Sequence, residues 1–221
     1  MLVLHSGTFS TVGERLRRRQ VPIGAIVCAA QNFLNSKLGS DVAIKPTIYK
    51  LKISLSDLNR DIYDSLNLTI ARHPSETMER MMVRVLAYCL NTRDQLVFCK
   101  GLSDTDEPDL WSHSLDGNLQ LWVDVGEPAA ERVKKSSRVA QQLRVYCFNN
   151  KAPTWWQQNK DQISKLAVDV YRFEWEQVQT LASISDRSMD FSITISGDSV
   201  YIASELGECE LMLETLQENS R

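Results

Sequence analysis

Apolar and polar residues alternate near the start of the main part of the chain. From Thr47 onward every second residue is apolar, at Tyr49, Leu51, Ile53 and Leu55. A period of two is typical of a strand with one buried face. After a turn-like stretch at Ser56–Asp61, the alternation returns at Leu66, Leu68 and Ile70. These two segments predict an antiparallel hairpin.

A segment with helical periodicity follows this hairpin. The sequence His73-Pro74-Ser75-Glu76 has the composition of a helix start, with an acid in the first turn. Apolar residues then recur at helical spacing, at Met78, Met81, Met82, Val85, Leu86 and Cys89. We therefore expect a helix that runs to about Leu90 and is stopped by Asn91–Asp94.

The rest of the chain predicts further strands and helices in turn. Strands are expected at Gln95–Lys100, Leu119–Val125, Leu143–Phe148 and Ala167–Phe173. Helices are expected from Pro128 to about Gln142, Thr154 to Leu166 and Glu174 to Ala182. Ser103–Ser114 is predicted to be a polar connection with a short helical turn, and Phe191–Ile195 with Val200–Ile202 a closing hairpin. This order predicts an α/β fold with a mixed sheet.

The first 42 residues differ in charge from the remainder. Their net charge is +3, with a basic run at Arg15–Arg19, whereas the net charge of the other residues is −6. We interpret residues 1–42 as a disordered or non-native extension. Residues 43–221 are expected to form a single domain, because they contain no Gly-, Pro- or Ser-rich linker and no internal repeat.

Charge and cysteine usage limit the environment and the partners. A net charge of −3 excludes a basic field over the whole protein, so nucleic-acid binding would need a local basic patch. The five cysteines form no CxxC pair and mostly lie in apolar runs, which predicts free thiols in a reducing, cytoplasmic compartment. No apolar stretch approaches the roughly 20 residues of a membrane span, and the three histidines have no zinc spacing.

Carboxylates and lysines are the remaining candidate chemistry, since the motifs GxxxxGK[ST], GxGxxG and GxSxG are absent. Asp106-Glu107-Pro108-Asp109 places three acids in four residues, and Asp124 lies near the end of an apolar strand. Such acids bind hard cations such as Mg²⁺. Two structural alternatives stay open. The first run can be the acidic first turn of a short helix, and Asp124 can pair with an arginine or with backbone N–H groups.

A lysine on the helix after Pro128 would complete such a site. Ala130, Val133, Ser137 and Ala140 have helical spacing and are expected to pack on the sheet. Lys134 lies next to this stripe, whereas Lys135 points to the opposite side. Lys134 is therefore the candidate that turns toward Asp124, although a solvent-exposed helix face is the alternative.

Four separate blocks of the sequence resemble the YaeQ family. They are Ala71–Met82, Asp106–Trp111, Leu121–Gly126 with the following Arg132–Lys135, and Trp155–Gln158. The resemblance covers the chain from about Ala43 to the C-terminus. It implies a restriction-endonuclease-like core of the PD-(D/E)XK nuclease superfamily, with an N-terminal and a C-terminal β-hairpin added to it.

The resemblance also implies roles for individual residues. Asp109 and Asp124 would be the two metal-binding acids, with Glu79 or Glu76 as an acid from the first helix and Lys134 in place of the superfamily lysine. Glu107 is a secondary candidate, and Gln142 with Tyr146 has the spacing of a QxxxY element. The sequence departs from the superfamily pattern after Val125, where Gly126 stands instead of a lysine.

Three functions are compatible with these residues. The first is a Mg²⁺- or Mn²⁺-dependent phosphodiesterase that acts on DNA or RNA. The second is a non-catalytic nucleic-acid- or protein-binding module that keeps the nuclease fold and uses the basic helix Arg132–Arg138 with Trp155 and Trp156. The third is a structural or regulatory protein without nucleic-acid contact.

Overall fold

The computed structural model describes residues 45–99 and 106–219. In chain order its elements are β1 (Thr47–Asp57), β2 (Ile62–Arg72), α2 (Met78–Leu90), β3 (Leu96–Phe98), β4 (Leu110–His113), β5 (Leu119–Val125), α3 (Ala130–Ser136), β6 (Gln142–Cys147), α4 (Ala152–Ile163), β7 (Asp169–Phe173), α5 (Trp175–Ser183), β8 (Ser188–Ser196), β9 (Ser199–Ser204) and β10 (Gly207–Gln217). The proposed extension, residues 1–42, lies outside the described residues.

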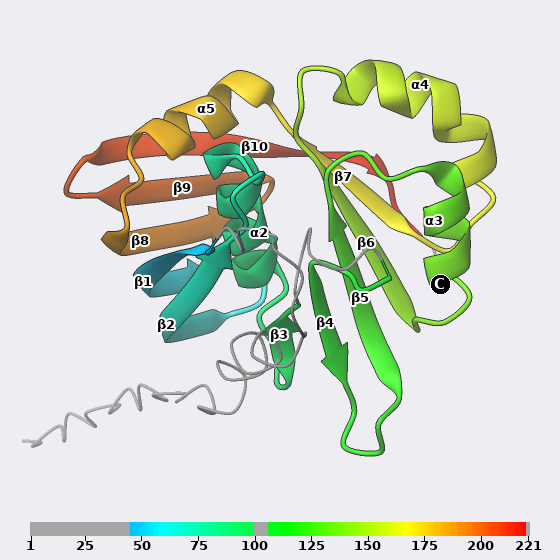
Figure 1. Ribbon diagram of the computed structural model, residues 1–221, viewed down its shortest axis with the longest axis horizontal. Helices are drawn as coiled ribbons and strands as arrows, with labels where there is room; N and C mark the ends of the chain where they lie inside the picture. The colour runs from blue at the N-terminus through cyan, green and yellow to red at the C-terminus, as the bar shows by residue number, and fades with distance from the viewer. Residues whose placement is uncertain (1–44, 100–105, 220–221) are drawn as a thin grey trace, which may run out of the picture.

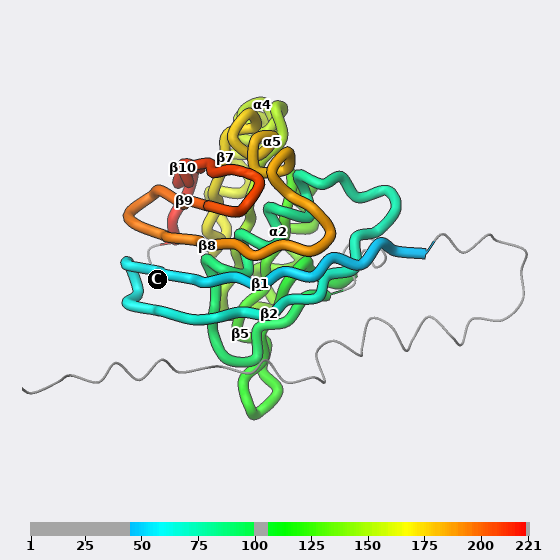
Figure 2. The backbone as a smooth tube through the Cα atoms, turned by 90° about the vertical axis from the view of Figure 1, so that its left-hand side faces the viewer, coloured from blue at the N-terminus to red at the C-terminus, as the bar shows by residue number. Residues whose placement is uncertain are grey.

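All ten described strands belong to one mixed sheet, in the order β2-β1-β8-β9-β10-β7-β6-β5-β4-β3. The sheet curves into a nearly closed, barrel-like form (Figure 1). Its two arms are β2-β1-β8-β9 and β7-β6-β5-β4-β3, which β10 joins, and α2 lies between them. Figure 2 shows the β4–β5 turn at the end of the molecule opposite α4. The fold is therefore a mixed α+β fold, as the alternating pattern of strands and helices predicted in outline.

The N-terminal hairpin confirms the strongest alternation in the sequence. β1 and β2 pair antiparallel over their full length, with Leu51 opposite Leu68 and Ile53 opposite Leu66. β1 also pairs parallel with β8, which joins the two predicted hairpins in one sheet.

The long helix α2 begins five residues later than the sequence predicts. Thr77 has an extended backbone and its side chain accepts a hydrogen bond from Arg80 N at 3.2 Å, so it caps the helix. From Met81 to Cys89 every residue is buried. The helix is buried all round because the two arms of the sheet close on it from different sides.

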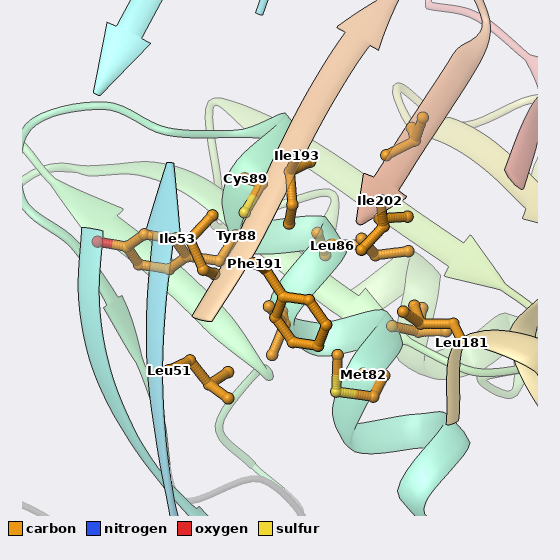
Figure 3. Close-up of a cluster of buried hydrophobic side chains, with 14 of the residues drawn as sticks. Leu51, Ile53, Met82, Leu86, Tyr88, Cys89, Leu181, Phe191, Ile193 and Ile202 are labelled. Atoms are coloured by element: carbon orange, nitrogen blue, oxygen red, sulfur yellow. The ribbon is translucent and has the colours of Figure 1, made fainter. Parts of the chain in front are cut away.

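The main core surrounds α2 and contains residues from both arms of the sheet. Figure 3 shows Phe191 and Ile193 of β8 facing Met82 and Leu86 of α2, with Leu181 of α5 beside them. A second core lies on the other face of β5–β7, where α3 and α4 pack. It contains Trp122, Val133, Leu143, Val145, Cys147, Ala152, Ile163, Val168 and Val170.

Two predicted elements are wrong in type or extent, and one strand was not predicted. Residues 110–113 form strand β4 rather than part of a polar connection, because Leu110 and Ser112 are buried between β3 and β5. Helix α3 ends at Ser136 rather than near Gln142, which is the first residue of β6. The unpredicted strand is β10. It pairs with both β9 and β7 and so connects the two arms.

The described cysteines are free thiols, as expected. Cys89, Cys147 and Cys209 are buried and Cys99 is half-buried. Burial raises the pKa of Cys89 to about 12, so this thiol stays protonated and acts as a small apolar side chain. None of the helices in residues 45–99 and 106–219 combines the length and apolar character needed to cross a bilayer.

Candidate functional site

The two predicted acids lie together at the ends of neighbouring strands. β4 and β5 pair antiparallel with Leu110 opposite Val123. Asp109 N donates to Val123 O at 2.9 Å, and Val125 N donates to Asp109 Oδ2 at 2.8 Å. Asp109 and Asp124 are only 4% and 3% exposed. The strand register therefore brings together two buried carboxylates that are 15 positions apart in the sequence.

Arginines from α2 engage the first of these acids. Arg80 Nη2 donates to both Asp109 carboxylate oxygens, at 2.8 and 3.0 Å, and Arg84 Nε lies 3.6 Å from Oδ1. Both arginines also contact Glu76, with Arg80 Nη1 and Arg84 Nη1 each 2.9 Å from a Glu76 oxygen. Glu76 is buried just before the Thr77 cap and holds the two guanidinium groups in place.

The second acid is engaged by an arginine from α3. Arg132 donates to Asp124 from Nε at 3.1 Å and from Nη2 at 2.8 Å, and Nη2 also donates to Glu107 O at 2.9 Å. The guanidinium lies over the Trp122 ring, 5.7 Å from its centroid. Burial raises the pKa of Asp124, and the charge of Asp109 adds to this effect, whereas the bond from Arg132 opposes it.

A backbone reversal after β5 makes the contact between Arg132 and Asp124 possible. Gly126 has φ +109°, a conformation that side chains with a Cβ rarely adopt, and its N–H donates to Tyr146 O at 2.9 Å. The chain then turns into α3, and Arg132 in the first turn of this helix reaches Asp124 near the end of β5. Glycine at this position is thus required by the turn.

Together these side chains form two neighbouring acid–arginine groups, Glu76 and Asp109 with Arg80 and Arg84, and Asp124 with Arg132, which we call the acid–arginine network. Its members are Glu76, Arg80, Arg84, Asp109, Asp124 and Arg132. In these contacts each of the three carboxylates is paired with at least one guanidinium group. Buried charges of this kind are tolerated only when they are paired and hydrogen-bonded. The pairing of Asp124 with an arginine was one of the alternatives left open by the sequence.

Other predicted members of the site lie elsewhere. Lys134 is exposed and pairs with Glu131 at 3.9 Å, and Arg132 holds the position next to Asp124. Glu79 is half-buried in the first turn of α2, whereas Glu76 is the helix-side acid that connects to Asp109 through the arginines. Glu107 is half-buried and contributes its backbone oxygen to Arg132.

The QxxxY pair lies on the other face of the sheet from Asp124. Gln142, Arg144 and Tyr146 alternate with Leu143 and Val145 along β6, and the latter two belong to the α3–α4 core. Tyr146 is buried in the main core, where its hydroxyl accepts from Asn91 Nδ2 at 2.8 Å. Gln142 Oε1 accepts from Arg93 Nη1 at 3.0 Å. These two residues are therefore connected to the C-terminal end of α2 and not to the acid pair.

The two tryptophans proposed as binding residues are half-buried. Trp155 and Trp156 pack against the core beneath α3 and α4, and Trp155 Nε1 donates to Pro128 O at 3.0 Å. Trp155 thus fixes α4 against the loop that precedes α3.

The residues present do not fit a magnesium ion in this arrangement. Both oxygens of Asp109 and both oxygens of Asp124 accept hydrogen bonds from positively charged guanidinium groups. A cation in the same place would have to displace them. Among the described residues, no three His, Cys, Asp or Glu side chains converge closely enough to hold a metal ion.

The segment that contains α3, β6 and α4 carries an excess of positive charge. From Ala130 to Leu166 the chain has eight basic and two acidic residues, a balance of +6, whereas the rest of the chain carries −9. Helices α3 and α4 contact one another on the same side of β5–β7 (Figure 1). We name their exposed surface the α3–α4 layer. Its exposed cations are Lys134, Lys135, Arg138, Lys151, Lys160 and Lys165, against the exposed acids Glu131 and Asp161.

Comparison with known proteins identifies the family. The model of the YaeQ protein family matches residues 42–213. The chain belongs to the YaeQ family. Over 181 residues it is 34% identical to the YaeQ proteins of Escherichia coli (strain K12) and of Salmonella typhi, covering 81% of this chain and 100% of each relative.

Solved YaeQ structures have the same fold as this YaeQ-family chain. The crystal structure of the YaeQ protein from Xanthomonas axonopodis pv. citri matches with a TM-score of 0.76 and 32% identity, covering 78% of this chain and 99% of that one. The YaeQ protein from Pseudomonas syringae matches with a TM-score of 0.74 and 36% identity, covering 78% and 96%.

Proposed function

We propose that this YaeQ-family protein is a non-catalytic module of the PD-(D/E)XK nuclease-like superfamily that binds the phosphate backbone of DNA or RNA. The α3–α4 layer is the contact surface. The observation that carries the proposal is its exposed charge, six cations against Glu131, Asp161 and the neighbouring Asp106, which pairs with Lys135 at 3.0 Å, in a chain that is acidic overall. Clustered lysines and arginines on one face favour phosphate contacts, which dominate nucleic-acid affinity.

The superfamily relationship rests on the placement of the acids. Pro108-Asp109 lies directly before β4, and Asp124 lies next to it on the neighbouring strand β5. In this proposal the two acids no longer hold a metal ion. Arg80 and Arg132 neutralise them instead, and Arg132 ties α3 to the end of β5. The network then serves to orient the helix that carries half of the binding surface.

Free thiols are consistent with the environment that such a function requires. The four described cysteines are unpaired, which favours a reducing compartment and so the cytoplasm, where nucleic acid is accessible.

Binding in excess EDTA tests this proposal. We expect fluorescently labelled single-stranded DNA and RNA to bind the wild type, and the triple variant Lys134→Gln, Lys135→Gln, Arg138→Gln to bind at least about tenfold more weakly, because each lost phosphate contact weakens the electrostatic attraction. Fluorescence anisotropy measures both affinities.

The matched control removes the same charge from another surface. Lys45, Lys50 and Lys52 are exposed and lie on or just before β1, in the other arm of the sheet. Their triple replacement by glutamine is expected to leave the affinity within about twofold, provided that the α3–α4 layer is the contact surface. Equal losses in the two triple variants would refute the assignment of the surface.

Metal-dependent phosphodiester hydrolysis is the second candidate. It is favoured by one observation, that two buried carboxylates lie close enough for the charge of Asp109 to raise the pKa of Asp124. This candidate requires Arg80 and Arg132 to withdraw, so that the freed acids bind Mg²⁺ or Mn²⁺.

Thermal unfolding with and without Mg²⁺ or Mn²⁺ separates the two candidates. The binding module predicts the same small change of melting temperature, below about 1 °C, in the wild type and in Asp124→Asn. A larger increase in the wild type that is lost in Asp124→Asn, together with cleavage of DNA or RNA, would favour the nuclease instead.

A further inference from the structure

Three arginines from separate parts of the chain meet beyond the C-terminal end of α2. Arg60, in the β1–β2 turn, donates to Cys89 O at 2.9 Å and to Thr92 O at 3.2 Å. Arg144 of β6 donates from Nη1 to Asn91 Oδ1 at 2.6 Å. Arg93 follows the helix directly. We name these three residues the arginine cluster.

The partners of the arginine cluster leave one positive charge unbalanced. Arg60 pairs with Asp57 at 2.6 Å, and Arg144 Nε lies 3.4 Å from Asp169 Oδ2. Arg93 donates instead to two neutral oxygens, Gln142 Oε1 at 3.0 Å and Asn91 O at 3.4 Å. Three guanidinium groups thus face two carboxylates.

The positive charges of Arg144 and Arg60 repel that of Arg93. Burial lowers the pKa of Arg93, and the neighbouring charges of Arg144 and Arg60 lower it further. The negative end of the helix dipole favours cations here, and Arg60 binds Cys89 O in the last turn of α2 and Thr92 O just beyond the helix. The helix dipole does not provide Arg93 with a formal negative charge.

The cluster is open to solvent and its unused donors suit an oxyanion. The side chains of Arg60 and Arg144 are 32% and 24% exposed, and Arg93 is half-buried. Among the described residues, Nη2 of Arg93 makes no hydrogen bond. A planar guanidinium presents its N–H groups as a fork that matches two oxygens of a phosphate or carboxylate.

We propose that the arginine cluster is a binding site for a small oxyanion, a phosphate or a carboxylate group, with Arg93 as the principal ligand. Gln142 holds Arg93 and Asn91 holds Arg144, which gives the two guanidinium groups fixed positions. Asn91 is itself fixed by the Tyr146 hydroxyl. The Gln142–Tyr146 pair would then support this site rather than the acid pair. The proposal is independent of nucleic-acid binding, because the α3–α4 layer covers the opposite face of β6.

Thermal unfolding with inorganic phosphate, with acetate and with chloride at equal ionic strength tests the proposal. At about tenfold its dissociation constant, the bound anion is expected to raise the wild-type melting temperature by about 3–5 °C. Arg93→Gln is expected to reduce this shift below about 1 °C. The control Arg187→Gln, which removes an exposed cation directly before β8 and outside both proposed surfaces, is expected to keep the full shift.

The three salts identify the chemistry of the ligand. A shift with phosphate alone assigns the site to phosphate groups, and a shift with acetate alone assigns it to carboxylates. No shift beyond that of chloride, or an unchanged shift in Arg93→Gln, would overturn the proposal.

Chemical modification of the wild type gives a readout that does not depend on how the variant folds. Phosphate or acetate, whichever stabilises, is expected to slow the reaction of Arg93 with phenylglyoxal at least about fivefold relative to the exposed Arg187, as peptide mass spectrometry would show. Equal protection of both arginines would overturn the proposal.

Discussion

Glu76→Gln is expected to lower the free energy of unfolding by about 3–5 kcal/mol, since it leaves a buried positive charge without its partner. The Glu76 side chain is 1% exposed and contacts both Arg80 and Arg84. Glutamine keeps the shape of the side chain but removes its charge, so Arg80 and Arg84 would share a single carboxylate, that of Asp109. Urea unfolding of the variant and the wild type measures the loss.

Glu79→Gln is the matched control for this substitution. Glu79 lies three residues further on, half-buried in the first turn of α2, where its charge interacts favourably with the helix dipole. We expect a cost below about 1 kcal/mol. Similar losses in the two variants would contradict the assignment of Glu76, rather than Glu79, as the helix-side acid of the network.

Leu86→Ala is expected to cost about 2–5 kcal/mol, because it opens a cavity in the centre of the main core. Leu86 is fully buried on α2, near Phe191 and Ile193 of β8 (Figure 3). The cavity would lie where α2 faces the β1–β8–β9 arm, so the surrounding strands cannot collapse into it without disturbing their pairing. Chemical unfolding with an unchanged denaturant slope identifies this as a loss of native-state stability.

Leu115→Ala provides the same change of side chain at the surface. Leu115 lies in the β4–β5 turn and is 94% exposed. Its replacement is expected to change the stability by less than about 0.5 kcal/mol. A Leu86→Ala variant as stable as Leu115→Ala would show that the sheet does not close on α2.

The elements that follow a single clear period could be predicted from the sequence. β1 and β2 alternate strictly because one face is buried and the other is exposed, and α2 repeats at helical spacing. β4 was not predicted because it is only four residues long and stands between acidic and polar residues. Its identity as a strand depends on pairing with β3 and β5, which is a long-range effect.

β10 shows a different limit of sequence interpretation. Its charged and apolar residues alternate at Glu208, Cys209, Glu210 and Leu211, but the burial becomes irregular toward its end. There the strand leaves β9 and pairs with β7, with a register shift between Thr215 and Gln217. A strand that passes from one partner to another cannot keep one simple period, because its exposed face changes along its length.

The acids of the candidate site could be predicted, but their partners were not. Glu76, Arg80 and Arg84 are spaced by four residues, and this spacing was the available signal that an acid just before α2 lies near two arginines on one face of the helix. Arg132 had no comparable signal. Its contact with Asp124 depends on the backbone reversal at Gly126, whose direction the sequence does not specify.

The salt dependence of nucleic-acid binding tests the proposed function most directly. In EDTA, the logarithm of the wild-type association constant for a DNA duplex should fall linearly with the logarithm of salt concentration, with a slope of about −4 to −5 if five of the six exposed cations of the α3–α4 layer contact phosphates. Replacement of Lys134, Lys135 and Arg138 by glutamine should reduce the magnitude of that slope by about 3. Binding that is absent or independent of salt, or a slope unchanged in the triple variant, would contradict the proposal.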